Sequence, residues 1–334
     1  MAIKLFKPYM SWRAIFYTVR TLLSDQIAEG PVVKQFENEF AKKFNKKNVV
    51  ALNSGTTALE LAYELAGIGK DDEVITPVLT CTATNLPLVR RGAKIVFADI
   101  NTDLNINVKD VESKITDKTK AIVFVHFGGN NRGLRELVKL CKARKIILVE
   151  DAAQVIGSNY WGVADYTCVS LQAIKTLTSG DGGFLITKSK KDYEKARRLR
   201  WFGYDRDEKQ KKGDTDLKEA GYKYHMSDIT ASIGLGNLRS IDKVIAHRKM
   251  LADYFNSQPG FRCHPWLCVY YGKVPAHIPH SQHHYRNDKY TIFKPFKNDC
   301  PTMDAVENYW TLIPYHHGIS LRQAKKIVNE IRKS

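Results

Sequence analysis

One lysine of the sequence stands where a reactive amine could be held in a dry pocket. Lys175 follows the apolar stretch "YTCVSLQAI" and precedes "TLTSGDGG", a turn that contains three glycines. Burial lowers the pKa of a lysine, and the neutral amine can then form a Schiff base with an aldehyde. The position of Lys175 therefore predicts covalent chemistry with a carbonyl compound.

Two other stretches place polar residues directly after strand-like runs. Asp151 and Gln154 follow "KIILVE", and Gly55, Thr56 and Thr57 open a helical pattern after "NVVALNS". A buried carboxylate needs a cationic partner, and the free N–H groups and hydroxyls at a helix start can hold a phosphate. Pyridoxal phosphate would use all these groups, because it has an aldehyde, a phosphate and a ring nitrogen that an acid keeps protonated. The glycines behind the lysine would let backbone approach a flat cofactor.

The elements that must position these residues form an alternating series of strands and helices. Apolar spacing predicts a helix over 32–44, and the runs "DEVITPVLT", "KIVFADI", "KAIVFVHF" and "KIILVE" alternate with helical segments. Such alternation is typical of a mostly parallel sheet with helices on both faces, whose ligands lie beyond the carboxyl ends of the strands. His126 ends one of these strands, so we expect it to contact the substrate.

The pattern changes after the glycine-rich turn, which indicates a second part of the chain. Ser227, with Asp228, can cap a long helix there. We expect a large domain over residues 1–240, of which 1–30 form an N-terminal arm, and a small domain over 241–334.

The composition is typical of a soluble globular protein. The chain has 334 residues, 43% of them hydrophobic, and no apolar run reaches the roughly 18 residues that span a bilayer, so we expect no membrane partner. The net charge of +17 indicates a lysine-rich surface that would also attract a phosphorylated substrate. No nucleic-acid-binding motif is visible, so no nucleic-acid partner is expected. The six cysteines lack a C-x-x-C pair, which favours reduced thiols without disulfides and a cytoplasmic location.

Five motifs occur in an order that resembles a known family. They are "NSGTTALELA", "DEVITPVLTCTAT", "VEDAAQVIGSNYWG", "VSLQAIKTLTSGDGG" and "GYKYHMSDITASIGLGNL". Together they resemble the DegT/DnrJ/EryC1/StrS family of nucleotide-sugar aminotransferases, which depend on pyridoxal phosphate. The resemblance implies an α/β fold of the aspartate-aminotransferase type (PLP-dependent transferase, type I), with a mostly parallel central sheet and a small, shortened C-terminal domain.

The resemblance also implies an activity and an assembly. An amino group would pass from glutamate to a nucleotide-linked keto sugar of the 4-keto-6-deoxy type, for surface polysaccharide or glycoconjugate biosynthesis. The cofactor would alternate between pyridoxal 5'-phosphate and its PMP form during turnover. The chain would form a homodimer whose active sites are shared between the subunits.

The predicted site residues take their roles from the matching positions of the family's motifs. Lys175 matches the Schiff-base lysine and Asp151 the residue that faces the pyridine nitrogen, so these two are the predicted catalytic residues. Gln154 matches the residue beside the ring hydroxyl. The predicted phosphate contacts are Gly55, Thr56, Thr57 and Ser170, together with Lys223, which stands where a partner subunit commonly offers Asn.

Several positions depart from the family's pattern. Cys81 occupies the place of an aromatic side chain that stacks on the cofactor. His225 replaces an Arg of many relatives, which leaves the donor carboxylate without an assigned partner. The stretch "HHYRNDKY" resembles a sequence near the substrate mouth in some members, so His284, Arg286 and Asn287 are further predicted substrate contacts.

Two other interpretations of the fold compete with an aminotransferase. The shortened C-terminal domain leaves open a non-catalytic or regulatory binding protein, although Lys175, Asp151 and Gln154 argue against it. A sugar dehydratase of the family would carry His at the lysine position, so Lys175 excludes the simple form of that idea.

A cluster of histidines invites a metal site. Its members are His277, His280, His283 and His284. Prolines at positions 275 and 279 argue against the regular helix that would align them, and no acid or cysteine lies within the cluster. We therefore expect no metal.

Overall fold

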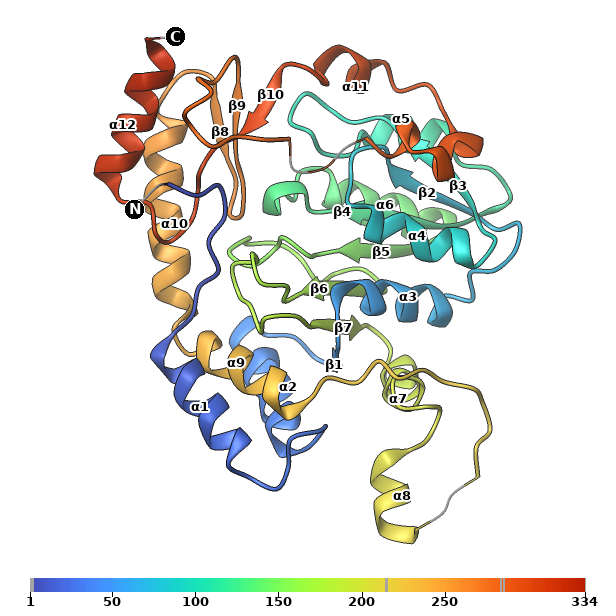
Figure 1. Ribbon diagram of the computed structural model, residues 1–334. Coiled ribbons are helices and arrows are strands. Elements are labelled where there is room, and N and C mark those ends of the chain that lie inside the picture. Colours follow the sequence, from blue (N-terminus) through green and yellow to red (C-terminus); the bar gives the residue numbers. More distant parts are fainter. Residues whose placement is uncertain (1–2, 214–215, 283, 285, 334) are drawn as a thin grey trace.

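The computed structural model describes residues 3–213, 216–282, 284 and 286–333, which Figure 1 shows as a ribbon. A seven-stranded sheet forms the centre, in the order β1-β7-β6-β5-β4-β2-β3. β7 runs antiparallel to β1 and β6, while the pairs from β6 to β3 are parallel. The predicted α/β fold with a mostly parallel central sheet is therefore confirmed. The strands are β1 (Val49–Leu52), β2 (Glu73–Pro77), β3 (Lys94–Ala98), β4 (Thr119–Val125), β5 (Ile147–Asp151), β6 (Tyr166–Ser170) and β7 (Gly183–Thr187).

Helices cover both faces of this sheet. Alternate residues of β1 belong to different core clusters: Val50 and Leu52 pack in the cluster that contains α3, and Val49 and Ala51 in the cluster that contains α2 and α9. Both faces of the sheet are thus apolar and need a helical layer. The helices of this part are α1 (Trp12–Leu22), α2 (Pro31–Phe44), α3 (Gly55–Leu65), α4 (Thr82–Arg90), α5 (Val108–Ser113), α6 (Leu134–Arg144), α7 (Lys190–Leu199), α8 (Arg206–Lys212) and α9 (Asp228–Leu238), with the 3₁₀ turn η1 (Phe127–Gly129).

The helix predicted after Ser227 is shorter than expected. Ser227 caps α9, but α9 ends at Leu238, and α10 (Ile241–Asn256) begins after a break. Asp228 serves a different helix, because its Oδ1 accepts N–H groups from Gly30 and Val33 at 2.9 Å each and so caps the start of α2. We propose the boundary between the two domains at the break between α9 and α10.

The C-terminal part is built on a small antiparallel sheet. Its order is β10-β9-β8, and it packs with α10 and α12. The N-terminal segment before α1 runs along this part, where Lys4 O accepts a hydrogen bond from His316 Nε2 at 3.0 Å (Figure 1). The remaining elements are β8 (Phe261–Cys263), β9 (Cys268–Tyr271), η2 (Asn287–Lys289), η3 (Thr291–Phe296), α11 (Pro301–Val306), β10 (Trp310–Leu312) and α12 (Leu321–Arg332).

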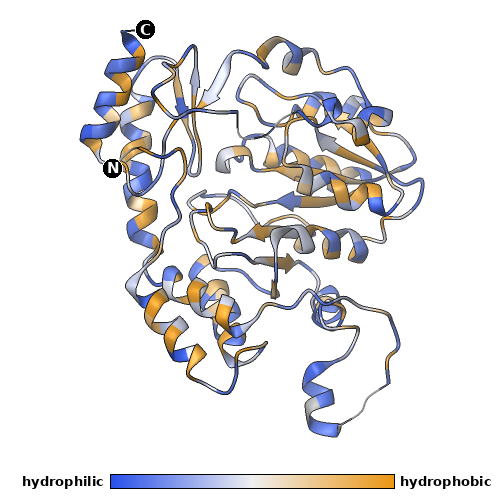
Figure 2. Ribbon diagram, viewed as in Figure 1, coloured by the Kyte–Doolittle hydropathy of each residue, from blue (hydrophilic) through white to orange (hydrophobic). Residues whose placement is uncertain are grey.

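Helix α1 carries an apolar stripe on its outer side. Trp12 is 85% exposed, Phe16 63% and Leu23 83%, and further apolar residues of the helix extend the stripe at helical spacing. The opposite side, with Ala14 and Thr18, packs on α9. Part of the apolar surface of α1, which is orange in Figure 2, is therefore not buried in the core of this chain.

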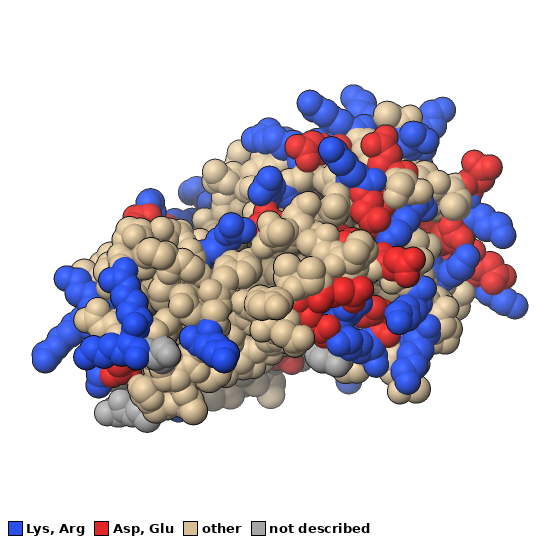
Figure 3. All heavy atoms as spheres, turned by 90° about the horizontal axis from the view of Figure 1, so that it is seen from above, with Lys and Arg blue, Asp and Glu red and all other residues tan. Residues whose placement is uncertain are grey.

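Basic and acidic side chains are mixed on the surface. Figure 3 shows Lys and Arg side chains interspersed with Asp and Glu over the right-hand part of the upper face, while Lys and Arg predominate at its left-hand end. This arrangement is typical of a solvated charged surface. Within the described part of the chain, no helix has both the length and the apolar character needed to cross a membrane.

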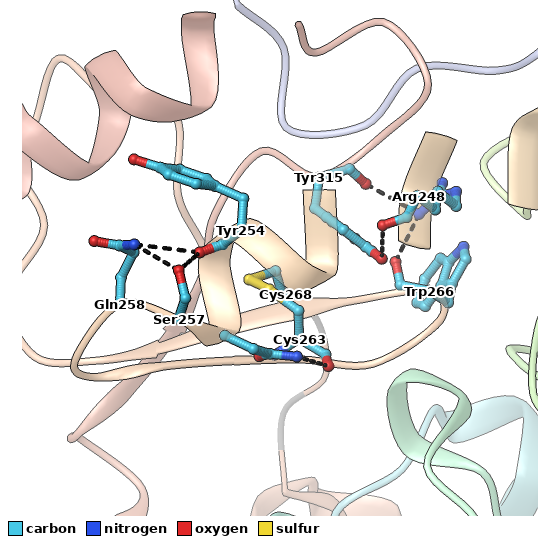
Figure 4. The surroundings of a disulfide bond; sticks show 9 residues. Arg248, Tyr254, Ser257, Gln258, Cys263, Trp266, Cys268 and Tyr315 are labelled. Carbon is cyan, nitrogen blue, oxygen red and sulfur yellow. Dashed lines mark hydrogen bonds between the residues drawn. A yellow bond between two sulfur atoms is a disulfide. The ribbon is translucent and has the colours of Figure 1, made fainter. Parts of the chain in front are cut away.

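Two of the six cysteines form a disulfide, so the prediction of reduced thiols throughout is wrong for this pair. Cys263 ends β8 and Cys268 begins β9, and the two residues are direct partners across this antiparallel hairpin (Figure 4). Their separation by five residues gave no signal in the sequence, because only the turn between them brings the thiols together. The other four cysteines are free thiols, and the cytoplasmic location stays a prediction.

Candidate active site

A pocket of about 410 Å³ lies at the carboxyl ends of β4, β5 and β6. Its wall also includes the start of α3, the loop before α4 and the turn after β6. This is the edge at which a mostly parallel sheet binds ligands. The pocket brings together nine predicted site residues: Gly55, Thr56, Cys81, His126, Asp151, Gln154, Ser170, Lys175 and His284.

Lys175 presents an amine suited to attack a carbonyl group. The residue is half-buried, and its Nζ lies 4.1 Å from the centroid of the Trp266 ring. It makes no ion pair or side-chain hydrogen bond with the described part of the chain. Burial lowers the pKa of Lys175 to about 8, although the nearby Asp151 and Cys81 act in the opposite direction. Near pH 8 a large fraction of this amine is therefore neutral and nucleophilic.

Two of the glycines behind Lys175 are required by the packing of the chain itself. A Cβ on Gly183 would lie 2.5 Å from the carbonyl oxygen of Ser54, so the glycine lets β7 approach the start of α3. Gly182 has a φ of +132°, and a Cβ there would meet Ser179 Oγ at 2.6 Å. Gly183 therefore brings β7 close to the start of α3, and Gly182 has the positive φ expected of this turn, while an approach of these glycines to the cofactor stays a prediction.

The start of α3 forms an anion cradle with the end of β6. Ser54 caps the helix by accepting the N–H of Thr57 at 3.0 Å, while Gly55 and Thr56 keep first-turn N–H groups that have no partner within the helix. A Cβ on Gly55 would lie 2.7 Å from the Cβ of Ser170, so glycine is required for the helix start to reach the strand. Thr57, also a predicted phosphate contact, lies outside the pocket wall, and its hydroxyl donates to Asn53 Oδ1 at 2.8 Å.

Asp151 is held rigidly at the end of β5. The residue is 5% exposed, its Oδ2 accepts a hydrogen bond from Thr84 Oγ1 at 2.7 Å, and its Oδ1 accepts the N–H of Ala153 at 3.1 Å. Thr84 was not among the predicted residues, although the motif "CTATNL" places it in the first turn of α4. Its hydroxyl fixes the direction of the carboxylate, which points into a pocket that also contains a lysine.

Gln154 connects the large domain to the C-terminal segment. Its Oε1 accepts the N–H of Gly128 at 2.6 Å, and its Nε2 donates to His284 Nε2 at 3.2 Å. Gln154 thereby holds His284 at the pocket wall, where both residues were predicted.

His126 and Glu150 form a buried pair behind the pocket. His126 Nε2 lies 2.8 Å from Glu150 Oε2, and both side chains are fully buried. Burial raises the pKa of Glu150, but the hydrogen bond from His126 and the N–H groups of Gly162 and Val163 hold it below its usual value. Among the described residues, none accepts or donates a hydrogen bond at His126 Nδ1.

Two predicted substrate contacts lie outside the pocket wall. Arg286 is 4% exposed and pairs with Asp288 at 2.7 Å, and hydrogen bonds from its guanidinium raise its pKa despite burial. Asn287 donates to Thr80 O at 2.7 Å and accepts from Asn85 Nδ2 at 2.8 Å. These two residues fasten the C-terminal segment to the loop before α4, and this packing accounts for their burial.

Lys223 does not belong to the pocket of its own chain. Its side chain is exposed, and its carbonyl oxygen accepts a hydrogen bond from Asn53 Nδ2 at 3.2 Å, beside the start of α3. His225 lies nearby and is half-buried, and burial lowers its pKa.

The histidine cluster is dispersed in the structure. His277 Nε2 pairs with Glu330 Oε2 at 2.9 Å, and His280 Nδ1 donates to Ile278 O at 2.7 Å. His283 lies outside the described residues. Among residues that the structure describes, no group of three His, Cys, Asp or Glu side chains is arranged to hold a metal ion.

The groups of the pocket fit pyridoxal phosphate. The cradle of Gly55, Thr56 and Ser170 offers N–H and hydroxyl donors for a phosphate, and a side chain on Gly55 would fill it. Lys175 offers an amine for the aldehyde, and Asp151 offers a carboxylate for a protonated ring nitrogen.

Comparisons with known proteins agree with this chemistry. The sequence model of the DegT/DnrJ/EryC1/StrS aminotransferase family matches residues 13–260. Spore coat polysaccharide biosynthesis protein SpsC of Bacillus subtilis is 34% identical over 261 residues, which cover 75% of this chain and 67% of that protein. UDP-4-amino-4-deoxy-L-arabinose--oxoglutarate aminotransferase of Shewanella sediminis is 32% identical over 287 residues, or 83% and 72% of the two chains. The structure also resembles a putative sugar aminotransferase from Streptococcus pneumoniae in its PMP form, with a TM-score of 0.91, 25% identity and coverage of 100% and 97%.

Proposed function

Because the chain belongs to the DegT/DnrJ/EryC1/StrS aminotransferase family, we propose that it moves an amino group from glutamate to a nucleotide-linked 4-keto-6-deoxy sugar. The protein is a sugar aminotransferase with pyridoxal phosphate as cofactor, so the alternative of a non-catalytic binding protein is wrong. One observation carries the proposal: Lys175, Asp151 and the start of α3 line a single pocket at the strand ends.

Three groups of the pocket would hold the cofactor. The N–H groups of Gly55 and Thr56 and the hydroxyl of Ser170 would bind its phosphate, and Lys175 would bind its aldehyde carbon. Asp151 would keep a proton on its ring nitrogen, because Thr84 fixes the carboxylate in one orientation. When bound, the cofactor supplies the carbonyl group that accepts the amine and the ring that spreads negative charge.

Lys175 would also move the protons of the reaction. Its neutral Nζ takes a proton from the α-carbon of the amino donor, and later an ammonium at the same atom delivers a proton to the sugar carbon that receives the amine. The low pKa of this lysine supports both roles, because the neutral and the protonated form are both populated near pH 8.

Two observations support the proposed substrates. The name of the Shewanella relative contains oxoglutarate, the keto acid that glutamate becomes, and a sugar with its amine at carbon 4. The net charge of +17 would attract both the nucleoside diphosphate of the sugar substrate and an amino donor with two carboxylates. The name of the Bacillus relative supports a place in polysaccharide biosynthesis.

We also propose a homodimer with shared sites. Lys223 is exposed outside its own pocket, and the apolar stripe of α1 has no cover within the described chain. In an isologous dimer each of these surfaces would be buried by the partner.

The decisive experiment supplies the loaded enzyme with glutamate and a panel of keto-sugar nucleotides and follows aminated products by mass. We expect product with 4-keto-6-deoxy sugars and none with Lys175→Ala. If only keto sugars of another type are aminated, the substrate class is wrong. If other amino acids support turnover and glutamate does not, the donor is wrong.

A further inference from the structure

The group placed directly against the Lys175 amine comes from the C-terminal part of the chain. Trp266 lies in the loop between β8 and β9, and the centroid of its ring is 4.1 Å from Lys175 Nζ. The residue is 1% exposed. No motif of the sequence pointed to it, because it occurs in a short stretch without periodicity. A ring face attracts an ammonium, and the attraction increases when water is excluded.

Contacts from four segments fix the Trp266 ring in this position. Its Nε1 donates to the carbonyl oxygen of Ile174 at 3.2 Å, directly beside the lysine, and its backbone N–H donates to Gly128 O at 2.8 Å. Its carbonyl oxygen accepts a hydrogen bond from the buried Arg248 at 3.0 Å, as Figure 4 shows. Its ring also stacks on Phe6, with the centroids 5.7 Å apart. These contacts therefore hold the ring in one position beside Lys175.

No charged residue that the structure describes in the pocket contacts the Lys175 amine as directly as the Trp266 ring does. Asp151 and Cys81 act on the amine electrostatically from β5 and from the start of α4. The other titratable residues of the pocket wall are His126, Cys168, Asp181 and His284. None of these residues forms an ion pair or hydrogen bond with Lys175 in the described structure, so the ring face is the group positioned to stabilise its ammonium.

We propose that Trp266 is a positioning residue that holds the free ammonium of Lys175 at the pocket wall. The inference rests on the proposed function, in which Lys175 must separate from the cofactor while the substrate's amine is bound and must still deliver a proton. A long side chain that is released into a pocket loses its orientation unless a fixed group retains it. The Trp266 ring supplies that fixed group, and the hairpin of the small domain carries it.

The test measures Lys175 in the cofactor-free protein. An amine-acylating reagent is applied over a pH series, and labelling of the Lys175 peptide is followed by mass. Trp266→Leu keeps an apolar wall but removes the ring face, so the ammonium should lose stabilisation and labelling at neutral pH should rise roughly two- to five-fold. Trp266→Phe keeps a ring and should label close to the wild type. Trp266→Met is a second ring-free variant in case the leucine variant does not fold.

A second lysine in the same protein provides the internal control. Lys46 Nζ lies 4.2 Å from the centroid of the Trp161 ring, outside the pocket, so its labelling profile should stay unchanged in every Trp266 variant. Equal labelling of Lys175 in the wild type and the ring-free variants would overturn the proposal. Slower labelling, or a phenylalanine variant that behaves like leucine, would overturn it as well.

The loaded enzyme gives an independent readout. In the ring-free variants kcat should fall more than KM for the amino donor changes, and Trp266→Phe should restore most of kcat. Equal changes in kcat of the phenylalanine and leucine variants would contradict a role of the ring. Because labelling needs neither cofactor nor sugar, failure of the proposed substrate assignment would leave the labelling result intact, and the two failures are distinguishable.

Discussion

At the scale of single residues, the site depends on one amine without an ion-pair partner in the described structure and on one fixed carboxylate. Burial lowers the pKa of Lys175 to about 8, whereas Asp151 is fastened by Thr84 and by the N–H of Ala153. The two side chains share a pocket without forming an ion pair within the described structure. The amine of Lys175 therefore remains able to attack an aldehyde, and the carboxylate of Asp151 remains able to pair with a protonated ring nitrogen.

The pKa of Lys175 predicts how cofactor uptake depends on pH. Only the neutral amine attacks an aldehyde, so the rate of pyridoxal phosphate uptake by cofactor-free protein should rise about tenfold per pH unit below pH 8 and level off above it. Stopped-flow absorbance measures this rate. Borohydride reduction should then leave the cofactor on the peptide that contains Lys175. A label on another lysine would show that the wrong amine was assigned.

The Asp151 carboxylate should be needed for turnover and not for binding. Asp151→Asn keeps the size of the side chain but cannot keep a ring nitrogen protonated, so kcat should fall on the order of a hundredfold while the cofactor stays bound. Cofactor absorbance and steady-state kinetics measure the two quantities. Near-native turnover would mean that Asp151 does not face the ring.

At the scale of elements, the pocket exists because the start of α3 touches the end of β6. The contact needs glycine at position 55, since a Cβ there would lie 2.7 Å from the Cβ of Ser170. The same approach is supported from the other side by Gly183 of β7, which packs on the backbone of Ser54. Helix start and strand end thus form one surface for an anion.

Gly55→Ala should weaken cofactor binding. The added methyl group must push α3 away from β6, so the dissociation constant for pyridoxal phosphate should rise on the order of tenfold or more. Gly69→Ala is the matched control, because a Cβ at Gly69 has no neighbour within 4 Å. Fluorescence titration of both variants measures the affinity. Equal affinities would show that the cradle lies elsewhere.

The sequence predicted those parts of the site that lie at the ends of regular strands or in the turns directly after them. Apolar strands followed by polar residues located Asp151 and Lys175, because the carboxyl ends of parallel strands meet at one edge. Trp266 could not be found in this way, since its loop has no period and its neighbours come from four distant segments. The break after α9 consists of Arg239 and Ser240. It contains no glycine or proline, so the sequence did not indicate that the helix ends there. Arg286 was predicted as a substrate contact from the resemblance of "HHYRNDKY" to a family sequence, and a resemblance of this kind does not show that Asp288 and Asp304 pair with the arginine.

At the scale of the whole molecule, the proposed dimer would cover an apolar surface that one chain exposes and would add Lys223 to the partner's active site. The stripe of α1 exposes Trp12, Phe16 and Leu23, and Lys223 lies beside the start of α3 without entering its own pocket. Exposed apolar side chains at helical spacing are typical of an interface between subunits. A two-fold axis would bury the stripe of α1 in the interface and would place Lys223 of each chain at the pocket of the other.

Mixing of two inactive variants tests the shared site. Lys175→Ala lacks the reactive amine, and Lys223→Ala should hold the phosphate poorly in the neighbouring subunit. After exchange at equal amounts, half the dimers are mixed and each has one site with both lysines intact, so activity should recover to about a quarter of the wild type. Native mass spectrometry confirms the exchange. Mixed dimers that stay inactive would place both lysines in the same chain's site.

The Asp228 carboxylate that caps α2 has a consequence for synthesis of the protein on the ribosome. The cap joins Gly30 to a residue 198 positions later, and Ser11 likewise bonds to Asn237 across 226 positions. We therefore expect both helices to emerge long before their partners exist, and the start of α2 must wait uncapped until α9 leaves the exit tunnel. A fragment that stops at residue 227 should be cut by protease within α2, whereas the full chain should resist cleavage there. Resistance of the fragment would mean that α2 is stable without its distant cap.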